Sequence, residues 1–385
     1  MITPAVDWLA IAPVIALAGA GVAIVLLRAL VRRAGWVYDA SLGISFVGLA
    51  VAAMFLVAQW SRVRGDGPYA ALSDMVVIDG FAVFLGAVVL VATALVLLLS
   101  AEFLPRRGFE SRAEYLALVG FSACGMIMMT TANDLIVVFM ALETLSIPLY
   151  VLSAFDRRRR RSLEAGLKYF LLGAFSSAVF LYGVALVYGA TGTTSLTGIA
   201  DFLARTTLLD QGTLLAGMML LLVGLGFKVA AVPFHWWTPD VYEGAPTPVT
   251  AFMSSATKAA AFAALMRVML SAFDIYRVDW RPVIWVLAVL TLVLGSVAAL
   301  LQTDVKRMLA YSSISHAGYV LIGLEAANRQ GLESALFYLM VYAFMAIGSF
   351  AVIAIVARTN DAHSIDDYRN LATRRPVLAA VFAVL

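Results

Sequence analysis

The sequence predicts an all-α polytopic membrane protein, and two observations carry this prediction. The 385 residues are 63% hydrophobic and only 13% charged, a balance that soluble domains of this size do not show. The apolar residues also gather in runs of about 18 or more, each long enough to cross the hydrocarbon core as a helix. The formal net charge of +3 provides no large basic surface, so nucleic acid is not an expected partner.

Eleven apolar runs predict eleven transmembrane helices, followed by the start of a twelfth. In chain order they are expected at 8–30, 42–60, 81–100, 115–131, 135–154, 165–188, 213–232, 248–273, 283–301, 308–324 and 335–356. The first run lacks a basic segment before it and an A-x-A site after it, so we interpret it as a retained helix. The run at 375–385 is too short to cross a bilayer, and we expect the natural protein to be longer.

The positive charges divide unevenly between the two predicted sides of the membrane. With the N-terminus outside, 17 Lys and Arg residues fall in the cytoplasmic loops and 6 in the opposite loops. The positive-inside rule therefore predicts an outside N-terminus. We interpret the run Arg157–Arg161 as a topology anchor at a helix end, with contact to anionic lipid or to a partner as the alternative.

One stretch combines a membrane helix, a lysine and a helix break. It is 224–248, GLGFKVAAVPFHWWTPDVYEGAPTP, in which Lys228 lies among apolar residues shortly before Pro233. A charge at the centre of a membrane helix costs about 2.5–3.5 kcal/mol on insertion scales. A helix broken beside such a charge is typical of ion sites in transporters. We therefore expect this stretch to form the centre of an ion pathway.

The chain has only four lysines, and three of them, Lys168, Lys228 and Lys258, lie in apolar runs. Because lysine loses its proton on burial far more readily than arginine does, this pattern places titratable cations inside the membrane. Glu143 is the one carboxylate well inside an apolar run and is the available acidic partner. Separating a Glu–Lys pair would release a proton, which predicts a proton switch. The alternative is a static pair that holds helices together.

Other polar residues near the apolar runs allow two interpretations each. His235, after the break, and His316, in AYSSISHAGY, are interpreted either as proton relays or as groups that satisfy the local backbone. Lys168 lies close to a helix end, where snorkelling is the alternative to a role in the relay. Arg267 is expected to be a structural or snorkelling arginine.

The remaining candidates offer little support for other chemistry. Asp240 and Glu243, in the loop after the break, are expected either to cap helices or to line a proton entrance. The sequence has no Walker A loop, no H-E-x-x-H motif and a single cysteine, Cys124. We therefore expect neither a cofactor nor a metal site in this chain.

Two long segments carry a specific resemblance to a known family. They are PFHWWTPDVYEGAPTPVTAFMSSATKAA at 233–260 and LQTDVKRMLAYSSISHAGY at 301–319. Both are similar to signature segments of the antiporter-like membrane subunits of proton-pumping NADH–quinone oxidoreductase (respiratory complex I). Within that family the chain most resembles the subunit N branch. Lys258 stands where the larger relatives have histidine, and Tyr338, Tyr342 and Ala346 stand where they and the related antiporters have two histidines and a lysine.

The resemblance implies an antiporter-like fold of fourteen helices with two inverted five-helix repeats and discontinuous helices 7 and 12. The chain would then divide into N-terminal helices at 1–112, a first repeat at 113–274 and an incomplete second repeat at 275–385. Glu143 looks like the family's helix-5 glutamate. The family also has one lysine in each of helices 6, 7 and 8, and these are matched in this sequence by Lys168, Lys228 and Lys258, which resemble them. The family's helix-12 lysine has no counterpart in this sequence.

The function implied is proton translocation in the inner membrane of a bacterium, coupled to NADH oxidation and quinone reduction in other subunits. NADH, flavin, iron–sulfur clusters and quinone would be bound elsewhere in the complex. The partners would be other membrane-arm subunits and the bilayer. Two alternatives stay open: a large subunit of a multi-subunit cation/proton antiporter, and a structural or quinone-contacting scaffold that moves no ions. The antiporter alternative predicts the helix-11 histidines and lysine that this sequence lacks.

Overall fold

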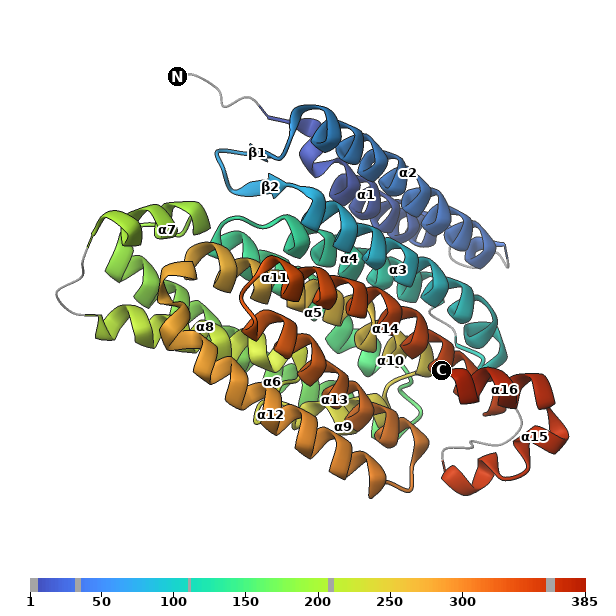
Figure 1. The fold of residues 1–385 in the computed structure, drawn as a ribbon. Coiled ribbons are helices and arrows are strands. Elements are labelled where there is room, and N and C mark those ends of the chain that lie inside the picture. The colour runs from blue at the N-terminus through green and yellow to red at the C-terminus, as the bar shows by residue number, and fades with distance from the viewer. Residues whose placement is uncertain (1–5, 32–35, 110–111, 207–210, 358–363) are drawn as a thin grey trace.

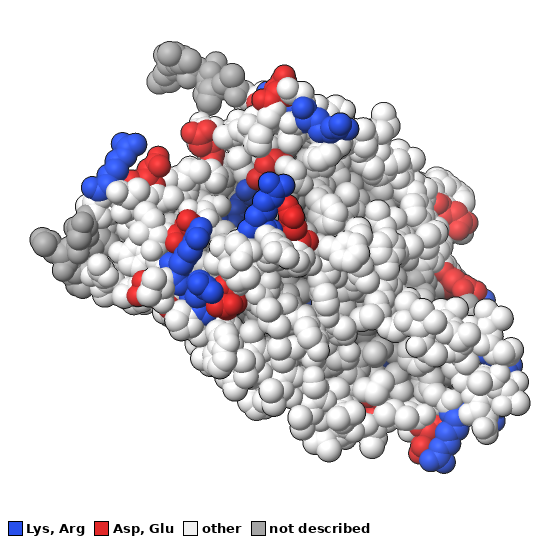
Figure 2. All heavy atoms as spheres, viewed as in Figure 1, with Lys and Arg blue, Asp and Glu red and all other residues white. Residues whose placement is uncertain are grey.

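In the computed structural model the chain forms a bundle of long helices lying side by side (Figure 1). The structure describes residues 6–31, 36–109, 112–206, 211–357 and 364–385. Within these ranges ten helical stretches are long and apolar enough to cross a membrane. On the face drawn in Figure 2, charged side chains gather toward the two ends of the bundle and leave an uncharged band between them. The predicted all-α multi-pass membrane protein is confirmed.

The long helices lie close to their predicted positions. They are α1 (Trp8–Leu30), α2 (Val37–Asp66), α3 (Gly80–Arg106), α4 (Arg112–Thr131), α5 (Leu135–Ser153), α6 (Arg160–Thr191), α8 (Gly212–Val229), α12 (Arg277–Leu300), α13 (Val305–Glu325) and α14 (Arg329–Val356). Asp7, Asp79, Asp134 and Asp304 precede α1, α3, α5 and α13, and each accepts a hydrogen bond from a backbone N–H of the first turn. Such caps explain where these four helices begin.

Several short elements lie in segments predicted as loops. A two-stranded antiparallel hairpin, β1 (Tyr69–Ala71) and β2 (Val76–Ile78), follows α2, and α7 (Leu196–Arg205) follows α6. Nearer the end of the chain, η3 (Ile365–Tyr368) and α15 (Leu371–Arg374) also lie in a predicted loop, whereas α16 (Pro376–Val384) lies where the start of a twelfth helix is predicted, at 375–385. The elements in predicted loops have no long apolar run, so hydropathy alone does not detect them. Arg32, Arg33 and Arg358, which contribute to the predicted charge asymmetry, lie outside the described residues.

The predicted helix at 248–273 is interrupted rather than continuous. It consists of α10 (Thr247–Ser254), α11 (Ala256–Arg267) and the π-helix η1 (Val268–Ala272), and the short η2 (Asp274–Tyr276) follows. At the interruption the hydroxyls of Ser254 and Ser255 both donate to the carbonyl of Ala251, at 3.0 and 2.6 Å. Serine hydroxyls that bond the preceding turn compete with the helical backbone bonds and bend the helix.

The predicted break in the seventh helix is present. The helix α8 ends at Val229, Ala230 takes a left-handed conformation with φ of 61°, and α9 (Trp237–Gly244) begins after the turn. Two side chains bond backbone groups freed by the break. The indole of Trp237 donates to the carbonyl of Phe227 at 3.0 Å, and the backbone N–H of Val232 donates to the Thr291 hydroxyl of α12 at 2.9 Å. Discontinuous membrane helices require this kind of compensation.

Two isolated β-bridges join matching positions in the two halves of the chain. Asp134 pairs with Ser195, and Asp304 pairs with Ser364. Each aspartate caps a long helix, α5 or α13, and each serine caps the next short helix of its half, α7 or η3. In Figure 1, α7 and α15, which follows η3, lie toward opposite ends of the bundle.

A partly buried ion pair joins helices that are far apart in the sequence. The guanidinium of Arg267 on α11 donates to both carboxylate oxygens of Asp79 at 3.0 Å, and also to the carbonyl of Thr130 at 3.2 Å. These contacts hold α11 against the beginning of α3 and the end of α4. The structural role expected for Arg267 agrees with this geometry.

Close packing of α4 on α5 gives a testable consequence for stability. A Cβ atom at Gly125 would clash with backbone atoms of α5, including the nitrogen of Leu145, whereas a Cβ at Gly43 on α2 would meet nothing within 4 Å. We expect Gly125→Ala to lower the free energy of unfolding by about 1–3 kcal/mol, the usual cost of overpacking. Gly43→Ala is the matched control, and we expect it to be neutral or slightly stabilising. Thermal unfolding of the purified complex would measure both, and equal melting temperatures would contradict the prediction.

Candidate proton-transfer site

Lys228 lies in the last turn of α8, immediately before the break, and is 3% exposed. Its ammonium donates to the hydroxyl of Ser146 on α5 at 2.7 Å and to that of Tyr169 on α6 at 2.9 Å. The C-terminal end of a helix also favours a cation, because its last carbonyls point toward it. A charged lysine is therefore held in the bundle by two hydroxyls and a half-helix end.

The direct ion pair expected between Lys228 and Glu143 is not formed in the described part of the chain. Glu143 lies three residues before Ser146 on α5, about one helical turn from that partner of Lys228. Its Oε1 atom is buried and has no hydrogen-bond partner among the described residues. The hydroxyls of Ser146 and Tyr169 solvate the ammonium instead, so the carboxylate influences the lysine by its field and not by contact.

Lys258 lies in the first turn of α11 and is 2% exposed. Its ammonium donates to the backbone carbonyl of Ser313 on α13 and lies 5.9 Å from the ring centre of Tyr342 on α14. The ring of Tyr342 lies 4.8 Å from that of His316, whose Nδ1 is 2.5 Å from the hydroxyl of Tyr338. The fold therefore brings Lys258 and His316 into one polar group formed by three helices.

A row of aromatic and hydroxyl side chains leads from one buried lysine to the other. Tyr169, a partner of the first lysine, stacks on Trp237 at 4.6 Å, and Trp237 meets Tyr242 at 6.1 Å. Tyr242 and Tyr342 both lie beside the side chain of Ser313. The hydroxyls of Tyr242 and Ser313 are buried and lack hydrogen-bond partners within the described ranges. Buried polar groups normally bond protein or ordered water, so these hydroxyls mark positions suited to water.

His235 lies in the turn between the two half-helices and is 2% exposed. Its ring stacks on Trp236 at 4.9 Å, and its Nδ1 has no hydrogen-bond partner in the part of the chain that the structure describes. The side chains that bond the freed backbone at the break are those of Trp237 and Thr291. A relay role for His235 stays a prediction.

Lys168 lies apart from the buried lysines. Its side chain is 41% exposed and pairs with Glu164 at 2.5 Å and with Asp240 of α9 at 2.6 Å. Asp240 and Glu243, expected to cap helices or to line an entrance, are ion-pair partners of α6 and α13 side chains.

The fourth lysine, Lys306, is one of the 17 charges predicted in the cytoplasmic loops, but the structure buries it in the first turn of α13. It is 2% exposed, and its ammonium donates to the backbone carbonyls of Glu243 at 3.0 Å and Ala245 at 2.6 Å. These carbonyls end α9, so Lys306 caps that helix from α13. Its place next to Arg307 at a predicted helix start suggested exposure. In the sequence only its residue type argues against exposure, because all the other cations in the predicted loops are arginines.

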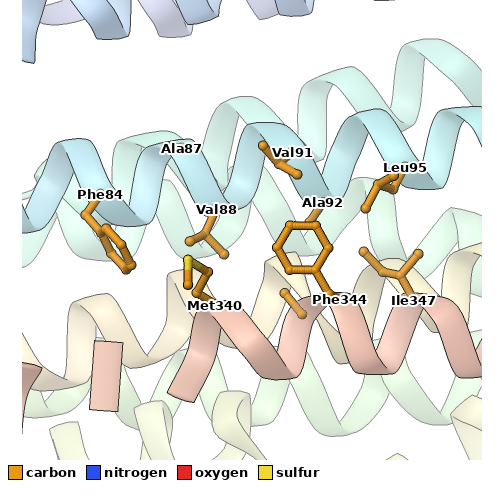
Figure 3. Close-up of a pocket in the computed structure, with 10 residues that line it drawn as sticks. Phe84, Ala87, Val88, Val91, Ala92, Leu95, Met340, Phe344 and Ile347 are labelled. Atoms are coloured by element: carbon orange, nitrogen blue, oxygen red, sulfur yellow. The ribbon is translucent and has the colours of Figure 1, made fainter. Parts of the chain in front are cut away.

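The clearest apolar cavity lies away from these groups. It has a volume of about 130 Å³ and lies between α3 and α14 (Figure 3). Its lining includes Phe84, Val88, Leu95, Met340, Phe344 and Ile347, and it has no charged group. No group of three His, Cys, Asp or Glu residues suited to a metal ion occurs among the described residues. The chemistry that the buried lysines and hydroxyls can perform is proton transfer.

Comparison with known proteins identifies the family. Residues 132–385 match the family described as NADH:quinone oxidoreductase/Mrp antiporter, TM. NADH-quinone oxidoreductase subunit N of Trichlorobacter lovleyi is 44% identical over 375 residues, which cover 97% of this chain and 75% of that protein. The chain belongs to the subunit N family of NADH-quinone oxidoreductase. Subunit N of Mycobacterium tuberculosis is 41% identical over 429 residues, covering 100% of this chain and 80% of that protein.

The fold of this chain is similar to that of chains in two solved complexes. A chain of respiratory complex I from Thermus thermophilus with bound aureothin is 36% identical, with a TM-score of 0.77, over 96% of this chain and 76% of that one. A chain of the Mrp complex from Dietzia sp. DQ12-45-1b is 24% identical with a TM-score of 0.84, and shows the shared fold alone. The chain is thus an antiporter-like, membrane-arm, proton-translocating subunit of the complex I assembly.

Proposed function

We propose that protons cross this subunit along the row of polar side chains that leads from Lys228 to Lys258 and His316. The observation that carries this proposal is the pairing of two buried lysines with neutral hydroxyl and carbonyl groups. An ammonium held by neutral acceptors can lose its proton without leaving a partner charge unpaired. NADH oxidation and quinone reduction would take place in other subunits, which would bind the NADH, flavin, iron–sulfur clusters and quinone.

The order of transfer follows from the contacts. The field of Glu143, with Ser146 and Tyr169, holds the proton on Lys228. Weakening that field would release the proton toward the hydroxyls of Tyr242 and Ser313 and any water bound there. Lys258, bonded to the Ser313 carbonyl, would first pass its own proton toward His316 and, as a neutral amine, would then accept the proton that Lys228 released.

We also propose the repeat division at 113–274 and 275–385, after N-terminal helices at 1–112. The two β-bridges support it, because Asp134 and Ser195 occupy positions in the first half that Asp304 and Ser364 occupy in the second. An inverted repeat would place them at opposite membrane surfaces. The arginine-rich loops support a cytoplasmic location for the end of the bundle that carries Arg157–Arg161, with the N-terminus on the other side of a bacterial inner membrane.

The transported ion tests this function. In vesicles containing the purified complex, NADH should drive acidification that is unchanged when Na⁺ is replaced by choline and is abolished by a protonophore. A pH-sensitive dye would report the proton gradient, and ²²Na⁺ uptake would report sodium movement. Acidification that requires Na⁺, or exchange of Na⁺ for H⁺ without NADH, would instead support the cation/proton antiporter.

A further inference from the structure

Two carboxylates of α9 are shared between the two halves of the bundle. The Nη1 atom of Arg307 on α13 donates to Asp240 at 2.7 Å and to Glu243 at 2.9 Å. The opposite side of each carboxylate binds a cation of α6: Lys168 contacts Asp240 at 2.6 Å, and Arg161 contacts Glu243 at 2.8 Å. We call these five residues the α9 clamp.

The α9 clamp acts on the shorter half of the broken helix. Because α9 has only eight residues, its own hydrogen bonds cannot hold it in one position. Asp240 and Glu243 are three residues apart and therefore lie on one face, where their like charges repel unless a cation lies between them. Arg307 is the one member of the clamp that contacts both carboxylates.

The helix that carries Arg307 also carries the acceptor of the second buried lysine. Ser313 and His316 follow Arg307 on α13 by six and nine residues, which is about 9 and 14 Å along a helix. Since Lys258 lies on α11, a shift of α13 relative to both α9 and α11 would therefore change the contact between Lys258 and the Ser313 carbonyl. The same shift would lengthen or shorten the contact between Asp240 and Arg307 relative to the contact between Asp240 and Lys168.

We propose that Arg307 is a positioning residue that couples the charge state around Lys168 to the transfer site at Lys258. With Arg307 in place, Asp240 is shared, and α9 and α13 move together. Without it, Asp240 pairs with Lys168 alone, and α13 keeps only the Lys306 hydrogen bonds to the backbone at the end of α9 among its described hydrogen bonds with that helix. The inference rests on the proposed proton path and adds to it a residue that contacts neither Lys228 nor Lys258.

The test uses the complete complex in vesicles, and its main readout is the ratio of the NADH-driven proton-pumping rate to the amount of assembled complex. We expect Arg307→Gln to lower this ratio about fivefold, the low end of coupling between distinct sites. Arg307→Lys should recover it to within about twofold, because a single nitrogen makes both contacts and an ammonium keeps the charge. Asp240→Asn should resemble Arg307→Gln, and the double variant should be no worse than either single one.

Controls separate coupling from assembly. Arg329→Gln removes an exposed pair with Glu333 on α14 and should leave the ratio unchanged. NADH oxidation with ferricyanide as acceptor, together with native gels, reports whether the rest of the complex is intact. A normal ratio in Arg307→Gln, or additive losses in the double variant, would overturn the inference. If Lys228→Ala also pumped normally, the proposed path itself would fail; a defect in Lys228→Ala alone would reject only the role of Arg307.

Discussion

Replacing Lys228 with alanine is expected to reduce NADH-driven proton pumping by about tenfold or more, a modest loss for the removal of a positioned proton carrier. Among the described residues the ammonium is the only charged group that bonds both Ser146 and Tyr169, and these hydroxyls cannot replace it as a carrier near neutral pH. NADH–quinone turnover should fall with it, because the two processes are coupled. Quenching of a pH-sensitive dye in vesicles would measure pumping, and absorbance at the NADH band would measure turnover.

A second substitution at the same position separates a proton carrier from a static cation. Arginine keeps its proton in proteins, so Lys228→Arg preserves the charge and removes the ability to release a proton. We expect this variant to be as defective as the alanine variant. Pumping by Lys228→Arg at the level of the unmodified complex would mean that the charge alone is needed. Full pumping by Lys228→Ala, in complexes that assemble normally, would remove Lys228 from the path.

Replacing Glu143 with glutamine is expected to reduce pumping about tenfold, equivalent to about 1.4 kcal/mol. The carboxylate makes no ion pair or hydrogen bond with Lys228, so it can act on the ammonium only through its negative field. Glutamine has nearly the same shape and no charge, and should therefore remove the field without creating a cavity. Initial rates of NADH-driven acidification, normalised to the amount of assembled complex, would measure the loss.

Glu143→Asp provides the matched control for charge. Aspartate keeps the negative charge but withdraws it by one methylene, so its effect should be milder than that of glutamine. Equal losses in the two variants would show that the position of the carboxylate matters and not its charge alone. Unchanged pumping by Glu143→Gln would show that the hydroxyls of Ser146 and Tyr169 are sufficient to hold the lysine.

The long helices and the break after Lys228 could be predicted from local sequence. Apolar runs determine which segments can enter a bilayer, whatever their neighbours are, and Pro233 interrupts a helix by its own geometry. The concentration of lysine within apolar runs likewise pointed to Lys228 and Lys258 before any contact was known. Short elements such as the β1–β2 hairpin and α7, and the interruption at Ser255, leave no comparable trace in hydropathy.

Tertiary structure decided which side chains form ion pairs and hydrogen bonds with one another. Arg267 binds Asp79 across 188 positions of sequence, and Lys228 meets Ser146 across 82. Local pattern cannot reveal such contacts, because they depend on how whole helices pack and not on the residues beside each member of the pair. Helix packing also explains why the structure differs from two predictions about charged residues. The ammonium of Lys228 bonds hydroxyls and not Glu143, and Lys306 is buried against the end of α9. The sequence alone identified Lys228, Lys258 and Glu143 as titratable groups within apolar runs, whereas packing determined which groups surround them and that Lys306 is buried as well.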